Sequence, residues 1–429
     1  MSGDKKYWLE TYGCQMNFAE SNALELALQD SGLVPAESAD KADYAIINTC
    51  SVRKTAENRI WGRIGYFQHL KESKEMKLII AGCMAERLGD EFLKEAPAVD
   101  HVMGTNDKLR IAALLRGAND ERDQNYSFTS SYYKEGDVKS FVPIMNGCNN
   151  FCSYCIVPYV RGREVSRSLE SILEEIEFLD SKGVKEITLL GQNVNSYNYK
   201  EITFSDLLLK IIEKTNSIRW IRFESPHPKD FSDDLIEVIA TQPKIAKHLH
   251  IPMQSGSTSV LKGMNRKYTK EHYLTLIDKL KKAVPNLTIT TDVMVGFPGE
   301  TEDDFHQTLQ VMEDLDFLEA FMYYFNPREG TKAVTMENQI PSEIKMARLQ
   351  LLIDQQRKRT VKLKEKRATG VVEVLVEGPS KKNPQNLLGK TEHDEMVVFD
   401  PVGELKVGDF VFVELEKLVG NTYNAHQIT

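Results

Sequence analysis

Short apolar runs alternate with segments of helical periodicity in the N-terminal part of the chain. The apolar runs at 6–12, 44–48 and 77–81 predict three strands. Apolar residues at helical spacing over about 19–31 and 52–70 predict two helices between those strands. Strands that alternate with helices in this way indicate a doubly wound parallel sheet.

The same alternation resumes after residue 140 with longer spacing. Helices are expected between successive strands, and six βα units of this kind predict a partial (β/α)6 barrel. In barrels of this class the chemistry takes place at the carboxyl ends of the strands. The expected strands are 140–145, 186–190, 218–224, 248–252, 287–295 and 318–325, and the expected helices are about 169–182, 205–215, 232–241, 270–284 and 302–314.

The pattern changes once more after Thr369-Gly370. Short alternating runs at 371–377, 395–398 and 410–415, with Gly and Pro between them, predict a small all-β barrel. Such barrels often bind single-stranded nucleic acid, but this segment has ten acidic residues and five lysines, so a packing role is the alternative. The chain is therefore expected to be an α/β protein with three domains, at residues 1–125, 134–367 and 368–429.

Composition narrows the class of protein. No apolar run has the length of a membrane helix and no signal peptide is recognised, so no membrane contact is expected. Six cysteines without a disulfide framework indicate a reducing compartment, and the cytoplasm is the expected location. The net charge of −9 argues against general coating of nucleic acid. Residues 341–367 nevertheless hold nine Lys and Arg against three acids, which indicates either a solvated helix face or proximity to RNA.

Three cysteines lie close together at Cys148, Cys152 and Cys155, with the spacing C-x3-C-x2-C. Thiolates in one short loop can hold an iron–sulfur cluster, which usually has four such ligands. With only three, one iron would stay free to bind a small molecule. A zinc site would need a fourth ligand nearby, but the next histidine is His227. Three cysteines packed as small apolar residues remain the alternative.

The other three cysteines, Cys14, Cys50 and Cys83, each stand just past the carboxyl end of a predicted strand. Ligands of open α/β sheets bind at that edge, where the connecting loops converge. The pattern therefore predicts a second metal cluster with three protein ligands. Unrelated buried cysteines are one alternative. A disulfide is another, although it would leave one of the three thiols unpaired.

The spacing of the first cysteine set resembles the signature of the radical S-adenosylmethionine (SAM) enzymes. In that superfamily the free iron of a 4Fe–4S cluster chelates SAM, and one electron splits SAM into methionine and a deoxyadenosyl radical. The residue before the last cysteine is typically aromatic and lies against the adenine. Tyr154 occupies that position here.

The resemblance also implies that polar groups after the barrel strands hold SAM. Gln192 stands where the superfamily usually has a Gly-Gly-Glu, so it would be a neutral version of that contact. His227 is a candidate acid or base, with a histidine satisfied by a hydrogen bond as the alternative. Arg266 is a candidate for the SAM carboxylate, with a surface salt bridge as the alternative. The further candidates for SAM are Ser225, Gln254 and Gly296.

The whole chain resembles the methylthiotransferases, which join a cysteine-bearing N-terminal domain to a radical SAM barrel and a small RNA-associated barrel called TRAM. The residues are most similar to the branch that modifies isopentenyl-adenosine beside the anticodon of tRNA. Sister branches act on threonylcarbamoyl-adenosine in tRNA or on an aspartate of a ribosomal protein. A non-enzymatic iron–sulfur or RNA-binding protein is a further alternative. The matching stretches are residues 11–17, 48–53, 156–167, 190–197 and 323–331.

The family resemblance implies two 4Fe–4S clusters and two SAM molecules per turnover. The cluster in the barrel would cleave SAM, and the radical would take the hydrogen from carbon 2 of the adenine. The N-terminal cluster would present the sulfur, which a second SAM would methylate. The expected partners are the anticodon stem-loop of tRNA and an electron donor such as flavodoxin or ferredoxin, with the chain itself a monomer. Candidates for RNA phosphates are Arg161, Arg163 and Arg167, and candidates for stacking on the extruded base are Tyr159, Tyr323 and Phe325.

Overall fold

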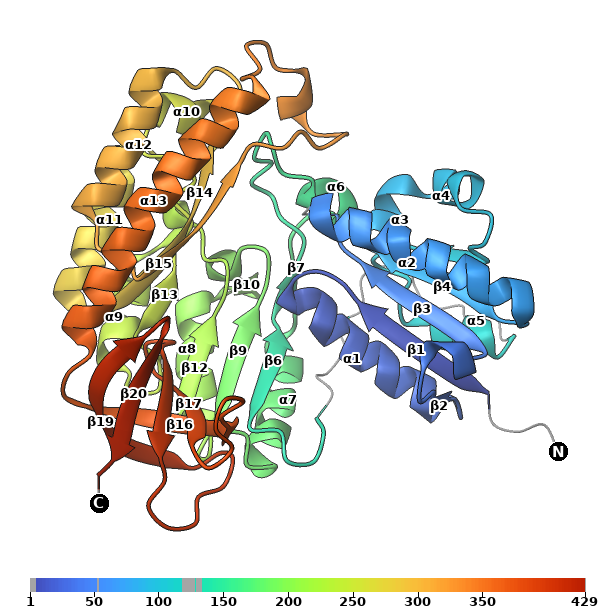
Figure 1. Cartoon of the computed structure of the whole chain (residues 1–429), viewed down its shortest axis with the longest axis horizontal. Helices are drawn as coiled ribbons and strands as arrows, with labels where there is room; N and C mark the ends of the chain where they lie inside the picture. The colour runs from blue at the N-terminus through green and yellow to red at the C-terminus, as the bar shows by residue number, and fades with distance from the viewer. Residues whose placement is uncertain (1–4, 52–53, 118–127, 129–132, 429) are drawn as a thin grey trace.

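The computed structural model describes residues 5–51, 54–117, 128 and 133–428 (Figure 1). The N-terminal domain is built on a five-stranded sheet whose strands are all parallel to their neighbours, in the order β2-β1-β3-β4-β5. The doubly wound parallel sheet expected for this region is confirmed. The strands are β1 (Lys6–Thr11), β2 (Val34–Pro35), β3 (Tyr44–Thr49), β4 (Lys77–Gly82) and β5 (His101–Met103).

Helices cover both faces of this sheet because successive strand residues point to opposite sides. Ile46 and Ile79 belong to a buried cluster with Leu24 of α1. The next residues along the same strands, Ile47 and Ile80, belong to a second cluster beneath α2. The helices are α1 (Gln15–Asp30), which begins earlier than expected, α2 (Lys54–Ser73), and three short helices that were not expected, α3 (Cys83–Leu88), α4 (Asp90–Glu95) and α5 (Arg110–Leu115).

The central domain is a partial barrel of six parallel strands. Two three-stranded sheets, β6-β9-β12 and β13-β14-β15, are joined where Ile221 of β12 bridges Ile245 just before β13. The outer strands are β6 and β15, so the barrel is open between them. All six expected strands are present, with ends that shift by a few residues. They are β6 (Lys139–Pro143), β9 (Glu186–Leu190), β12 (Trp220–Phe223), β13 (His248–His250), β14 (Thr288–Val295) and β15 (Glu319–Tyr324).

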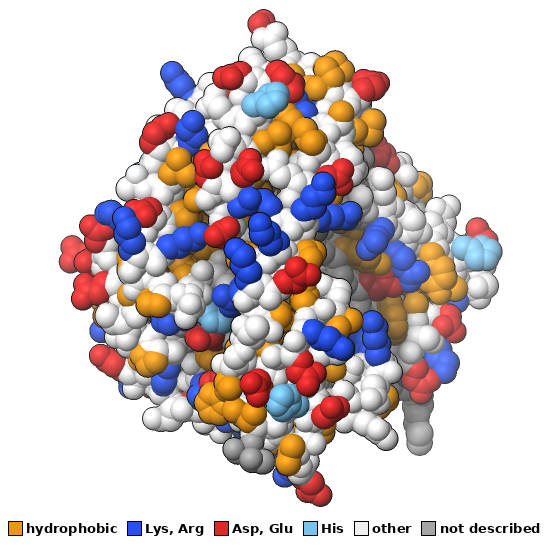
Figure 2. All heavy atoms as spheres, turned by 60° about the vertical axis from the view of Figure 1, so that its left-hand side comes forward, with side chains coloured by type: hydrophobic (Ala, Val, Ile, Leu, Met, Phe, Trp, Pro, Cys, Tyr) orange, Lys and Arg blue, Asp and Glu red, His pale blue; other side chains and the backbone are white. Residues whose placement is uncertain are grey.

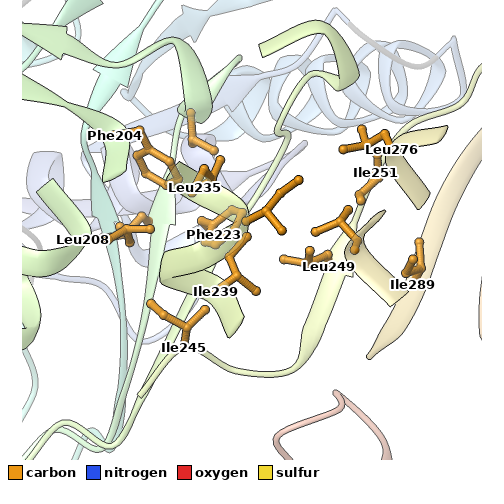
Figure 3. Close-up of a cluster of buried hydrophobic side chains, with 14 of the residues drawn as sticks. Phe204, Leu208, Phe223, Leu235, Ile239, Ile245, Leu249, Ile251, Leu276 and Ile289 are labelled. Atoms are coloured by element: carbon orange, nitrogen blue, oxygen red, sulfur yellow. The ribbon is translucent and has the colours of Figure 1, made fainter. Parts of the chain in front are cut away.

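The main core lies between these strands and the helices outside them. Figure 3 shows part of this core, in which the Phe204 ring packs edge-on against Phe223 with 5.2 Å between ring centroids. All five expected helices form, and a sixth follows β15. They are α7 (Leu169–Ser181), α8 (Phe204–Lys214), α9 (Asp233–Thr241), α11 (Lys270–Ala283), α12 (Glu302–Asp314) and α13 (Ser342–Arg367).

The C-terminal domain is a closed five-stranded barrel in the order β16-β17-β18-β20-β19. Alternate residues such as Val374, Val397 and Val413 fill its interior. The expected all-β barrel is confirmed, and two strands that the sequence pattern did not suggest, β17 and β20, complete it. The strands are β16 (Val371–Pro379), β17 (Leu387–Thr391), β18 (Met396–Asp400), β19 (Phe410–Val419) and β20 (Thr422–Gln427).

The turn between β17 and β18 covers the amino-terminal ends of the central strands. Arg222 of β12 donates to the carbonyl oxygens of Thr391 and Glu392, both at 2.9 Å, and to the Glu186 carboxylate at 2.8 Å. The His393 Nδ1 lies 3.0 Å from the carbonyl oxygen of Lys247, which precedes β13. The C-terminal barrel therefore forms a floor beneath the lumen of the central barrel.

A buried ion cluster joins the N-terminal domain to the central one. Arg161 ends the short helix α6 (Val157–Arg161), and its guanidinium donates to both carboxylate oxygens of Glu20 at 2.7 and 3.1 Å. It also donates to the side-chain oxygens of Asn17 and Asn146 at 3.0 and 2.9 Å. Lys108 pairs with the same glutamate. The expectation that Arg161 holds an RNA phosphate is therefore wrong, because its side chain is buried and engaged between domains.

The charge of Glu20 depends on this cluster. Burial alone would raise the pKa of its carboxyl, but attraction to Arg161 and Lys108 outweighs burial and holds the pKa at about 2. Loss of one cation from such a cluster leaves a buried charge without full compensation. The ion cluster therefore disfavours any arrangement that separates the two domains.

We expect Arg161→Ala to lower the free energy of unfolding by about 3–5 kcal/mol, the usual cost of removing one partner from a buried ion pair. The measurement is equilibrium urea unfolding of the cluster-free protein. Arg163→Ala is the matched control, because Arg163 is exposed two positions further on and should change stability by less than about 0.5 kcal/mol. Equal losses in the two variants would show that the ion cluster does not stabilise the contact between the domains.

Candidate functional site

The first cysteine set lies in the loop between β7 (Met145–Asn146) and α6, above the carboxyl end of β6. Backbone hydrogen bonds shape the loop: the Cys148 N–H donates to the Gly162 carbonyl at 3.2 Å, and the Cys155 N–H donates to the Cys152 carbonyl at 3.0 Å. The Gln192 side-chain oxygen accepts the Gly147 N–H at 2.5 Å. Gln192, expected to contact SAM, therefore anchors the cysteine loop.

The three thiols of this loop lie close enough to influence one another. Burial is the main cause that raises the pKa of Cys148. Burial also raises the pKa of Cys155 to about 12, and the charge of the neighbouring Cys152 is the second cause. Arg266 is the cationic partner, with its Nη1 3.4 Å from the Cys152 sulfur. Buried thiols of this kind ionise readily only when a metal group offsets their charge, which fits the chemistry of cluster ligands.

The N-terminal cysteines gather at the edge of the sheet that faces this loop. Cys14 precedes α1, Cys50 follows β3 and Cys83 begins α3 directly after β4. The loop at Gly13 approaches Cys50 so closely that a Cβ on Gly13, whose φ is +132°, would lie 2.7 Å from the Cys50 Cβ. Cys83 packs against Ile156, the residue directly after Cys155, and against Val160 of α6. The structure thus brings both cysteine sets to one domain interface.

Arg328 links the barrel to the surroundings of Cys50. It follows β15, and its Nη1 lies 3.5 Å from the Glu57 carboxylate of α2. Burial lowers the pKa of Arg328, while the Glu57 charge and Cys50 act in the opposite direction. Glu57 also pairs with Arg87 at 2.9 Å. A charged network therefore lies between the N-terminal cysteines and the mouth of the barrel.

Within the part of the chain that the structure describes, no three His, Cys, Asp or Glu side chains are arranged to hold a metal ion. Ligands of a single zinc ion converge on one point, whereas each thiolate of a 4Fe–4S cluster binds a different iron and stands further apart. Three-cysteine sets without a nearby fourth ligand therefore fit a cluster better than zinc.

Two residues expected to contact SAM have strained backbones at the barrel mouth. Ser225 follows β12 with φ +60° and Gln254 follows β13 with φ +67°, in the left-handed region that non-glycine residues rarely adopt. Gln254 accepts a hydrogen bond from the Tyr323 hydroxyl at 3.1 Å. Gln254 thus meets Tyr323, which lines the cavity together with Tyr154.

Gly296 does not offer open space beside its backbone. Its φ is +71°, and a Cβ there would lie 2.4 Å from the side chain of Lys345, which comes from α13. Its N–H donates to the Glu300 carboxylate at 2.6 Å. The close approach at this glycine is made by a lysine chain of the protein itself, and contact with a bound adenine stays a prediction.

His227 is a neutral histidine in this structure. Burial lowers its pKa to about 2, and its Nδ1 accepts the N–H of Lys229 at 3.2 Å. Its buried Nε2 has no hydrogen-bond partner among the described residues. A group with this pKa does not carry a proton near neutrality, so the expectation of an acid or base at His227 is not supported.

A cavity of about 1030 Å³ opens beside the barrel loop. It is lined at one end by Tyr154 and Cys155 and continues around β15 to Arg357 of α13 and Asn421 of the β19–β20 turn. Its volume lies at the upper end of the range for small-molecule sites, about 300–1,000 Å³. Figure 2 shows a hollow on this side of the molecule, with Lys and Arg side chains gathered beside it.

The two other arginines expected to contact RNA differ in exposure and in partners. Arg167 is buried, pairs with Glu175 and donates to Ser171, so the expectation that it binds a phosphate is wrong. Arg163 is exposed, with its guanidinium 4.3 Å from the centre of the Phe151 ring, and stays a candidate.

The basic run at 341–367 forms α13, and part of its charge is used inside the molecule. Lys345, Arg348 and Lys364 are buried. Arg348 pairs with Glu300 at 2.7 Å and Lys364 with Glu319 at 2.5 Å. The charges that remain for RNA on the exposed side of α13 are Arg357, Lys358, Lys362 and Lys366.

The expected stacking residues are less available than their sequence positions suggested. Phe325 is only 1% exposed and packs against Phe297, and Tyr323 is half-buried with its hydroxyl bonded. Tyr159 is exposed, but its ring packs edge-on against Phe151, with 6.0 Å between ring centroids, and it does not line the cavity.

The polar side chains that line the barrel lumen were missed by the sequence analysis. Asp292 of β14 and His250 of β13 lie there, 3.3 Å apart. The signal was present in the sequence, since every second residue from Thr288 to Asp292 is polar, as expected for a strand with one wet face. The Phe321 ring, 51% exposed, lies on the same wall.

Family models match all three domains. The radical SAM superfamily matches residues 142–312, the uncharacterized protein family UPF0004 matches residues 6–104, and the TRAM domain matches residues 369–425. Among solved structures, the chain is similar to the radical SAM methyltransferase TsrM from Kitasatospora setae, with a TM-score of 0.58, 13% identity, and coverage of 77% of this chain and 74% of that one. This likeness concerns the fold alone.

Sequence relatives extend over the whole length. A protein of Treponema pallidum strain Nichols, named tRNA-2-methylthio-N(6)-dimethylallyladenosine synthase, is 46% identical over 449 residues, which cover 98% of each chain. A protein of the same name from Bacteroides fragilis strain YCH46 is 42% identical and covers 99% of this chain and 96% of its own. The chain therefore belongs to the radical SAM methylthiotransferases, in the family of the tRNA-2-methylthio-N(6)-dimethylallyladenosine synthases (MiaB).

Proposed function

We propose that this protein replaces the hydrogen on carbon 2 of N6-isopentenyl-adenosine, next to the anticodon of tRNA, by a methylthio group. The observation that carries the proposal is the meeting of two cysteine sets at one interface, where Cys83 packs directly behind the loop of Cys155. One set alone would serve many radical SAM reactions, whereas sulfur insertion needs a sulfur source beside the radical source. The names of the relatives favour isopentenyl-adenosine over threonylcarbamoyl-adenosine and over a ribosomal aspartate.

The division of labour follows the proposed domains. Residues 1–125 would hold one 4Fe–4S cluster on Cys14, Cys50 and Cys83, and residues 134–367 would hold the other on Cys148, Cys152 and Cys155, with residues 368–429 as the TRAM barrel. When bound, these clusters and two SAM molecules supply the electron, the sulfur and the methyl group. The residues of the chain then have to position the reactants and exclude water.

Side chains around the barrel loop are suited to hold SAM. Tyr154 lines the cavity beside Cys155 and presents a ring for the adenine. Arg266 lies 3.4 Å from the Cys152 sulfur and can pair with a carboxylate bound beside that cysteine. Gln192 keeps the loop in place through Gly147.

The RNA would approach from the cavity side. An adenine that is already in a single-stranded loop leaves its stack at a cost of a few kcal/mol. Arg163 and the exposed lysines of α13 would attract the phosphates that flank it.

The proposal includes a low-potential donor such as flavodoxin or ferredoxin, a monomeric chain and a cytoplasmic location. No helix among the described residues is long and apolar enough to cross a membrane.

The substrate is tested by mass spectrometry of nucleosides from tRNA treated with the anaerobically reconstituted protein, SAM and a reductant. Parallel tRNAs carry isopentenyl-adenosine, threonylcarbamoyl-adenosine or unmodified adenosine. We expect the methylthio product only from the isopentenyl substrate. Cleavage of SAM without a product on any tRNA would contradict the proposal and direct attention to a protein substrate.

The separate tasks of the two cysteine sets are tested by Cys50→Ala. We expect this variant to lose methylthiolation but to keep measurable conversion of SAM to deoxyadenosine, because Cys50 belongs to the set outside the barrel loop. Deoxyadenosine and methylthio-nucleoside are quantified in the same reaction, with Cys148→Ala as the control that loses both. If Cys50→Ala loses both activities while the cluster of the barrel loop is spectroscopically intact, the tasks are not separate.

A further inference from the structure

One wall of the barrel lumen combines an exposed aromatic ring with a carboxylate. Phe321 of β15 is 51% exposed although it lies inside the barrel. Its register partner on β14 is Asp292, so the two side chains are neighbours on the same face. Both line the cavity that also contains Tyr154 and Cys155. An exposed phenylalanine in such a place lacks the burial that normally stabilises it.

The alternation of β15 shows that Phe321 points into the lumen. Ala320 and Met322 pack against the core between the strands and the outer helices. The residues that alternate with these two along β15, Phe321 among them, therefore face inward. The Phe321 ring lies 5.7 Å from the His250 ring of β13, and Tyr323 bonds Gln254 across the mouth.

The carboxylate of Asp292 is held in a defined orientation. Its Oδ2 lies 3.3 Å from the Nε2 of His250, whose Nδ1 lies 3.0 Å from the Thr290 hydroxyl. Among the described residues, none is found to donate a hydrogen bond to the Oδ1 of Asp292. The Asp292 side chain is 27% exposed, so this oxygen is available to a donor in the cavity.

The other aromatic residues of the cavity are buried, hydrogen-bonded, on the opposite face of β15 or, like Tyr154, proposed to hold SAM. Phe325 is buried, and the Tyr323 hydroxyl is bonded to Gln254. Tyr324 follows Tyr323 on β15 and points to the opposite face of the strand. Phe321 is therefore the aromatic side chain of this wall with a free ring face beside a hydrogen-bond acceptor.

We propose that Phe321 is the platform on which the extruded adenine stacks, and that Asp292 accepts a hydrogen bond from its N6–H. This inference rests on the proposed function and names the receptor for the substrate base. An adenine with one N6 substituent keeps one N–H at that nitrogen, so the site suits N6-monosubstituted adenines. An N6,N6-disubstituted adenine has no such donor and would leave the carboxylate without its partner.

The test measures the affinity of RNA hairpins for the protein with both clusters reconstituted and no reductant. Four hairpins differ only at the target nucleotide, which carries isopentenyl-adenosine, unmodified adenosine, N6,N6-dimethyladenosine or no base. We expect the native protein to prefer isopentenyl-adenosine over the abasic hairpin by about tenfold or more, as is typical of base–aromatic stacking. Phe321→Leu should remove most of this preference, and Phe321→Tyr should restore it.

Asp292→Ala tests the hydrogen bond separately. The native protein should bind the isopentenyl hairpin about tenfold more tightly than the dimethyl hairpin, and the variant should bind the two alike. Phe178→Leu is the matched control, because Phe178 is a 47% exposed phenylalanine on α7 that does not line the cavity. It should behave like the native protein, and thermal melting shows whether each variant is folded.

The outcomes separate this inference from the proposed function. If the native protein prefers isopentenyl-adenosine and the folded Phe321→Leu variant keeps the whole preference, the receptor assigned here is wrong while the proposed function stands. If the native protein binds all four hairpins alike, the receptor is likewise wrong, and the product assay alone decides the proposed function. Loss of the preference in Phe321→Leu, with recovery in Phe321→Tyr, supports the platform.

Discussion

A guanidinium buried between two domains sets the geometry on which the candidate site depends. Arg161 ends the helix that follows Cys155, and Glu20 lies on the helix that follows Cys14. Their hydrogen bonds at 2.7 and 3.1 Å therefore tie the two cysteine sets to each other through short, rigid connections. A buried ion pair adds little net stability compared with apolar packing, but separating its members is costly. Its main effect here is to select one arrangement of the domains.

The barrel presents a polar lumen because each strand uses its two faces differently. On β14, Ile289 and Val293 belong to the core beneath the outer helices, whereas Thr290 and Asp292 point inward. A lumen filled with apolar side chains would pack solidly and leave no space. Half-buried polar side chains need hydrogen-bond partners, which His250 supplies, and they keep a wet cavity open beside the cysteine loop.

Periodicity predicted the regular elements well and the fate of single polar residues poorly. The strand at 186–190 and the helix at 302–314 have the expected bounds, because every residue of the strand is buried and the helix buries one face at helical spacing. The first helix begins before residue 19, since its first turn follows Cys14 without a side-chain cap or an apolar repeat. Arg161 and Arg167 look like surface charges in the sequence. Glu20, the partner of Arg161, lies far away in the sequence. Glu175, the partner of Arg167, lies only eight positions further on, but the two side chains meet only once α7 has formed.

The same limit explains why Phe321 escaped notice, and the surrounding structure shows how a base could reach it. The floor of the lumen is covered by the β17–β18 turn through Arg222, and the N-terminal domain lies against α6 and the cysteine loop. Among the described residues, the barrel is open along β15, the outer strand that does not pair with β6, and the cavity there passes from Cys155 around the strand to Arg357. A nucleotide entering by this route passes basic side chains of α13 first, which attract its phosphates, and meets the Phe321 ring inside. The open edge of an incomplete barrel thus provides what a closed barrel would exclude, a lateral route by which a base that is still attached to its RNA strand would reach the lumen.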